Sequence, residues 1–112
     1  MSSKREEKIA LYTGALEKIN VKVDASLLEA TTKACGPSIY NADSECVSCS
    51  DSAETGRVKD GFLAKKLGVT GAKADEAVAY VCEKMGTSNR KKYRAVFYYL
   101  LVEKLNAKSK LK

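Results

Sequence analysis

Apolar residues recur at three- and four-residue steps along much of the chain, and this spacing is typical of helices with one buried face. The first such segment has an apolar face made of Ile9, Tyr12, Leu16 and Ile19. Ser2 or Ser3 would cap this helix at its start. Asn20 would end it.

Start and stop residues mark two further helices. Asp24 is a capping residue for a second helix, and Gly36 followed by proline is a typical end. Asp51 and Glu54 have the spacing of a capping box and open a third helix, which Gly68 ends. The expected inner faces are Leu27, Leu28, Thr31, Ala34 and Cys35 in the second helix, and Val58, Phe62, Leu63 and Leu67 in the third. Two glycines inside the third helix, at positions 56 and 61, suggest close packing there.

The last two helices differ in how their apolar residues are distributed. A fourth helix near Ala74 has one inner face and stops at Gly86; that face consists of Ala77, Val78, Val81, Cys82 and Met85. The final helix is expected to begin after Thr87 or Ser88. From Tyr93 to Leu105 its apolar residues cover the whole circumference, which is typical of a helix surrounded by protein.

No segment of strand length alternates between apolar and polar residues. The sequence therefore predicts an all-α fold, with about five helices packed around the C-terminal one in a single domain over residues 1–112. A sixth would form if residues 38–45 coil into a turn. Residues 37–50 are otherwise the one long irregular segment, and loops of this length are often functional or disordered.

Composition narrows the function classes. The chain has 112 residues, 45% of them apolar, with one proline and no histidine. Without histidine there is no imidazole base and no Ser-His or Cys-His pair, so an enzyme is not expected. No signal peptide and no apolar run long enough to span a bilayer is visible, since the longest run is Ala95–Val102. We therefore expect a soluble, cytoplasmic protein without a membrane partner.

The four cysteines suggest candidate chemistry. Cys46 and Cys49 form a C-x-x-C motif, and Cys35 and Cys82 could complete a tetrahedral zinc site of four thiolates. The alternative is that Cys35 and Cys82 are buried core residues and no cofactor is bound. Thiol–disulfide catalysis is a weaker interpretation, because C-x-x-C redox motifs usually accompany strands. In a reducing cytoplasm, thiols or metal ligands are expected more than disulfides.

Charge is concentrated near the C-terminal end. The formal net charge is +6, while residues 1–86 balance at −1. Arg90, Lys91, Lys92 and Arg94 would lie on the first turns of the last helix and could bind RNA, DNA or another polyanion. The alternative is a solvated basic face partly paired with carboxylates from another helix.

Three motifs resemble a small bacterial family of cytosolic proteins known as a domain of unknown function. They are GPSIY at 36–40, VSCSD at 47–51, and EKMGTSNR at 83–90 running into YRAVFYYLL at 93–101. The resemblance implies a bacterial source and a single helical domain, and transfers no site residues. We therefore expect a non-enzymatic binding or interaction module with an unknown protein partner; polyanion binding and a zinc module are the alternatives.

Overall fold

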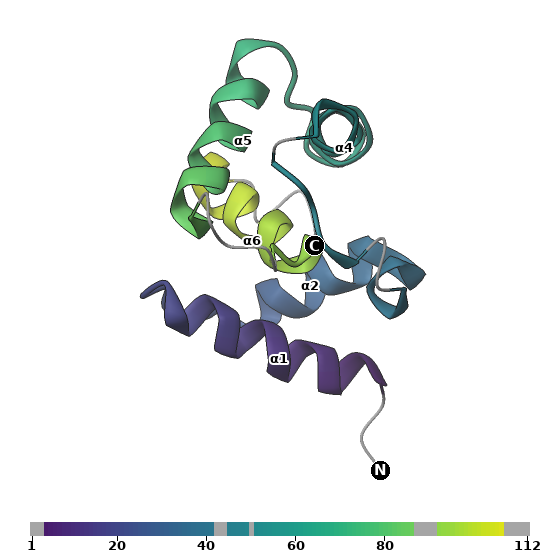
Figure 1. Cartoon of the computed structure of the whole chain (residues 1–112), viewed down its shortest axis with the longest axis vertical. Helices are drawn as coiled ribbons and strands as arrows, with labels where there is room; N and C mark the ends of the chain where they lie inside the picture. Colours follow the sequence, from purple (N-terminus) through teal and green to yellow (C-terminus); the bar gives the residue numbers. More distant parts are fainter. Residues whose placement is uncertain (1–3, 42–44, 50, 87–91, 107–112) are drawn as a thin grey trace.

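The computed structural model describes residues 4–41, 45–49, 51–86 and 92–106 (Figure 1). The regular structure of these residues is helical, so the all-α prediction is confirmed. The elements are α1 (Lys4–Lys18), α2 (Ala25–Cys35), the 3-10 helix η1 (Gly36–Tyr40), α4 (Ser52–Arg57), the π-helix η2 (Val58–Leu67), α5 (Ala72–Met85) and α6 (Arg94–Leu105). The short η1 is the turn expected near residue 38, although it starts earlier.

Asp24 and Asp51 act as the capping residues that the sequence predicts, while Ser2 and Ser3 lie outside the described residues. The Asp24 carboxylate accepts hydrogen bonds from the N–H groups of Ser26 and Leu27 and so satisfies two of the unpaired donors at the start of α2. The Asp51 carboxylate accepts from the Ala53 N–H at the start of α4. A capping box also requires the Glu54 carboxylate to accept from the Asp51 N–H, and this part of the prediction is wrong. The Glu54 carboxylate pairs with Arg57 and Arg94, and the Asp51 N–H donates to the Ser48 carbonyl.

The third predicted helix is continuous but changes its winding at residue 58. From there η2 has the wider turn of a π-helix, whose bonds join residues five apart. Its expected inner residues are all buried. The expectation of close packing at Gly56 and Gly61 is wrong, since a Cβ added at either position would meet nothing within 4 Å.

Helix α6 is the centre of the core. Every residue from Ala95 to Val102 is buried, with relative exposures between 0% and 8%, as the all-round apolar pattern predicts. It packs against α2, α5 and α1, and Figure 1 shows α6 between α5 and α2, with α1 running along the other side of α2. Glu103 and Lys104 are exposed, so the helix reaches solvent in its last turn.

The predicted start of the last helix is wrong. Lys92 is not helical and Tyr93 has an extended backbone, with α6 beginning at Arg94. Tyr93 pairs with Cys46 in an isolated antiparallel bridge, and the Val47 N–H donates to the Lys92 carbonyl at 2.7 Å. These contacts use the backbone in an extended form that a helix could not provide.

A disulfide joins Cys49 to Cys82 on α5, while Cys35 and Cys46 are free thiols. The expectation that thiols would prevail over disulfides is therefore wrong for this pair. Helical periodicity places Cys82 on the inner face of its helix, and it gives no information about a partner 33 residues away in an irregular segment.

Candidate functional site

The residues of the predicted polyanion site do not form one exposed helical face. The Lys92 side chain is buried, at 6% exposure. Arg94 is partly buried, and Arg90 and Lys91 lie outside the described residues. The basic first turn expected for the last helix therefore contains only Arg94.

Arg94 is paired inside the protein. Its guanidinium lies 3.3 Å from the Glu54 carboxylate and donates to the Tyr98 hydroxyl at 3.4 Å. Both members of the ion pair are mostly buried, with side-chain exposures of 11% and 15%. Burial raises the pKa of the Tyr98 hydroxyl. Arg94 thus has the carboxylate partner expected of a basic residue with a structural role.

The proposed zinc ligands are not brought together as two thiolates. Cys49 is bonded to Cys82, so its sulfur has no free thiolate to offer beside Cys46. Within residues 4–41, 45–49, 51–86 and 92–106, no group of three or more His, Cys, Asp or Glu side chains could hold a metal ion. The zinc module is not supported.

A polar cluster that sequence reasoning missed ties the irregular segment to α1. Glu45 accepts hydrogen bonds from the Tyr12 hydroxyl at 2.6 Å and from the Lys8 ammonium at 2.8 Å. Tyr12 is fully buried, and its ring lies 5.1 Å from that of Tyr93. The cluster anchors residue 45 beside the Cys46–Tyr93 bridge.

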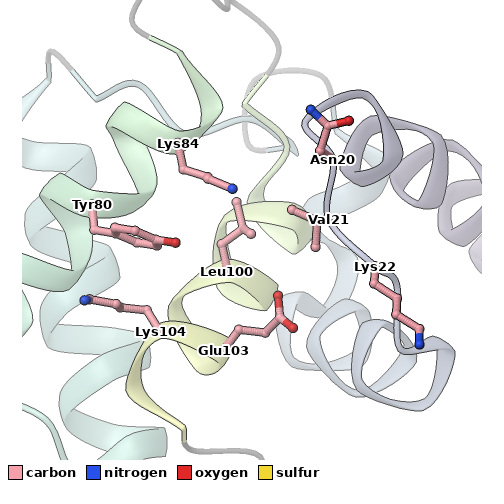
Figure 2. Close-up of a pocket in the computed structure, with 8 residues that line it drawn as sticks. All are labelled: Asn20, Val21, Lys22, Tyr80, Lys84, Leu100, Glu103 and Lys104. Atoms are coloured by element: carbon pink, nitrogen blue, oxygen red, sulfur yellow. The ribbon is translucent and has the colours of Figure 1, made fainter.

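The site that gathers exposed charge is a pocket of about 340 Å³ where α5, α6 and the α1–α2 turn meet. Figure 2 shows Tyr80, Lys84 and Lys104 on one side of it, with Lys84 pointing toward Leu100, and Lys22 on the opposite side. The residues that line the pocket are Asn20, Val21, Lys22, Tyr80, Lys84, Leu100, Glu103 and Lys104.

The backbone holds each wall of this pocket in place. Asn20 has the left-handed conformation, at φ 61°, and reverses the chain after α1. Tyr99 on α6 then pins the turn: its hydroxyl accepts from the Asp24 N–H at 2.8 Å and donates to the Lys22 carbonyl at 3.2 Å. Tyr80 and Lys84 are four residues apart and so share one face of α5.

Positive charge exceeds negative charge around this opening. Three lysines and one glutamate line it, which leaves a formal excess of +2. The Lys104 ammonium lies 4.8 Å from the centre of the Tyr80 ring, within cation–π range. Among the described residues, no carboxylate oxygen comes within 4.0 Å of the Lys22 or Lys84 ammonium.

Sequence reasoning missed this pocket because its lysines come from three distant segments. The only local signals were two pairs at helical spacing, Tyr80 with Lys84 and Leu100 with Lys104. Each pair also suits an ordinary exposed helix edge. The packing of α6 between α5 and the α1–α2 turn brings them together.

Comparisons with known proteins agree with the resemblance described above. A search of curated proteins finds no match. None of the helices among the described residues has the length and apolar character needed to cross a membrane. The family model described as "Protein of unknown function (DUF2853)" matches residues 11–109, and the chain therefore belongs to this family.

Proposed function

We propose that this protein is a non-enzymatic binding protein whose lysine-lined pocket takes a compact ligand bearing phosphate or carboxylate groups. The observation that carries this proposal is that Lys22, Lys84 and Lys104 line one opening, with Glu103 as the one carboxylate among its lining residues. An excess of positive charge around an opening favours a bound anion, because opposite charges attract.

The size and lining of the pocket support a small ligand. Its volume of about 340 Å³ is at the lower end of the range for small-molecule sites. Leu100 and Val21 contribute apolar surface, and Tyr80 contributes a ring that is 41% exposed. A ligand with an anionic group and a small apolar part would use all of these features.

Two alternatives stay predictions. Binding of RNA or DNA through Arg90, Lys91, Lys92 and Arg94 is not favoured by the pairing of Arg94 with Glu54 or by the burial of Lys92. Docking of a protein partner would engage the same lysines if the partner offered an acidic segment.

The test is a titration with tripolyphosphate, and in parallel with a ten-nucleotide single-stranded RNA, followed by calorimetry at low salt. We expect tripolyphosphate to bind the wild-type chain. Lys84→Gln combined with Lys104→Gln should weaken binding about tenfold, since removing two exposed ionic contacts costs about 1.4 kcal/mol. Raising the salt concentration should weaken binding further.

The matched control is Lys65→Gln with Lys66→Gln, which removes the same charge from exposed positions on η2. It should change the affinity by less than about twofold if the pocket is the site. Equal losses in the two double variants, or no binding of tripolyphosphate at millimolar concentration, would contradict the proposal. Binding of RNA alone, abolished by Arg90→Gln with Lys91→Gln, would favour the nucleic-acid alternative.

A further inference from the structure

Two cysteines form a disulfide, and a third cysteine lies close to one of them in the sequence. The disulfide between Cys49 and Cys82 ties the irregular segment to α5, and the free Cys46 lies three residues before Cys49. All three residues are only partly buried. The spacing of Cys46 and Cys49 is that of dithiol motifs whose two sulfurs can bond to one another. The molecule therefore combines a disulfide with a nearby thiol that could replace one of its members.

The other free thiol is less suited to this chemistry. Cys35 ends α2 and packs against the core. Burial raises the pKa of the Cys35 thiol to about 12, so that it stays protonated near neutral pH. A thiol, unlike a thiolate, does not attack a disulfide. Of the two cysteines outside the disulfide, Cys46, three residues from Cys49, is thus the candidate for exchange.

We propose that Cys46, Cys49 and Cys82 form a thiol–disulfide exchange centre. The Cys46 thiol loses its proton to solvent, and its thiolate attacks the Cys49 sulfur. A bond forms between the Cys46 and Cys49 sulfurs while the bond to Cys82 breaks. The Cys82 thiolate leaves and takes a proton from solvent. The number of disulfides is unchanged, so the step needs no oxidant or reductant.

The fold controls this exchange through the segment between the two cysteines. Val47 is buried at 3% exposure and its N–H is bonded to the Lys92 carbonyl, while Cys46 pairs with Tyr93. For Cys46 to reach Cys49, the chain between them must leave this extended arrangement and form a turn. Exchange therefore requires local release of the segment from the start of α6, and its product no longer ties that segment to α5.

The centre therefore has two covalent states that differ in structure. With the bond at Cys82, a cross-link of 33 residues' separation holds the irregular segment against α5. With the bond at Cys46, the cross-link is local and the Cys82 thiol becomes available. In the second state Cys82 on α5 would carry a thiol, and the irregular segment would no longer be cross-linked to α5. No net oxidation takes place. This inference is independent of the proposed pocket function.

The test is disulfide mapping of the full chain. The oxidised protein is incubated without added thiol at pH 6.5 and at pH 8.5, and samples are quenched in acid, alkylated, digested and analysed by mass spectrometry. We expect a peptide containing the Cys46–Cys49 bond to appear together with alkylated Cys82. It should form faster at pH 8.5, because the thiolate is the attacking species. Mild urea should accelerate it further by releasing the segment.

Two variants distinguish the proposal from random reshuffling. Cys46→Ser keeps the disulfide between Cys49 and Cys82 and should show a single isomer under all conditions. Cys35→Ser removes the other free thiol and should exchange at the wild-type rate. Free Cys82 appearing equally in Cys46→Ser, disulfides to Cys35 as the main product, or no Cys46–Cys49 bond at pH 8.5 with mild urea would each overturn the proposal.

Discussion

At the scale of single residues, Glu54 shows how position decides what a charge contributes. Its carboxylate meets two arginines: Arg94, with 11% of its side chain exposed, and Arg57, with 76% exposed. A pair in solvent is screened and contributes little, whereas removing one member of a mostly buried pair leaves the other charge without compensation. The sequence allowed a carboxylate partner for the basic run, but it could not identify Glu54, which lies 40 residues from Arg94.

Replacing these two arginines should therefore give different results. Arg94→Gln is expected to lower the free energy of unfolding by about 2 kcal/mol, because Glu54 keeps only the exposed partner and Tyr98 loses its donor. Arg57→Gln removes the same charge and should cost less than about 0.5 kcal/mol. Urea unfolding measures both. Equal effects would show that Arg94 contributes no more than a surface charge.

Buried thiol and phenol groups predict a loss of stability in alkali. Burial raises the pKa values of Cys35, to about 12, and of Tyr12, where the hydrogen bond to Glu45 adds to the effect. The unfolded chain releases these protons at lower pH than the folded one. The free energy of unfolding therefore has its full value below about pH 8 and falls as pH rises above 9. Cys35→Ala should make that fall shallower by about 1.4 kcal/mol per pH unit. Urea unfolding between pH 8 and 10.5 tests this, and parallel curves for the two proteins would contradict it.

At the scale of elements, signals that act within a few residues predicted the fold well. Asp24 and Asp51 cap the helices they were expected to cap. The inner faces of η2 and α5 are buried where the periodicity placed them, except that Cys82 is only partly buried. The predictions that were wrong concern contacts between residues far apart in the sequence. The start of α6 is set by the pairing of Tyr93 with Cys46, and no local pattern reports that contact.

Glycines provide a test of how well local conformation is understood. Gly61 is exposed, has no positive φ and would accept a Cβ freely, so Gly61→Ala should raise the free energy of unfolding by up to about 1 kcal/mol. Gly68 ends η2 in the left-handed conformation at φ 69°. Gly68→Ala should lower the free energy of unfolding by about 1 kcal/mol, because a Cβ disfavours the left-handed conformation even where nothing lies within 4 Å of it. Thermal and urea unfolding of both variants would decide; a shared sign would contradict the argument.

At the scale of the whole molecule, the main features that sequence patterns could not predict are those that join remote segments. The lysine pocket draws on positions from 20 to 104, and the disulfide spans 33 residues. No periodic pattern in the sequence predicts either feature, because each results from how the helices pack around α6. The central place of α6 itself was predictable, since its own residues carry the all-round apolar pattern.

Reducing the disulfide should show its contribution to the whole fold. A cross-link of this separation restricts the unfolded chain, and the loop-entropy model assigns it about 3–4 kcal/mol. We expect dithiothreitol, or Cys82→Ser, to lower the free energy of unfolding by roughly that amount while helical circular dichroism persists below the transition. Treating the double variant Cys46→Ser, Cys82→Ser with dithiothreitol is the control and should change little. Unchanged stability of the reduced wild type would mean that the cross-link does not constrain the unfolded ensemble.

The burial of Ala95–Val102 in α6 also bears on how the protein is made. The inner faces of α1, α2 and α5 pack against residues 94–105, which the ribosome adds after all of those helices. Until that stretch has left the exit tunnel, the earlier helices have no common partner to cover their apolar faces. The nascent chain therefore cannot complete its native packing before that stretch emerges, and a product terminated before residue 94 would present those faces to chaperones and proteases.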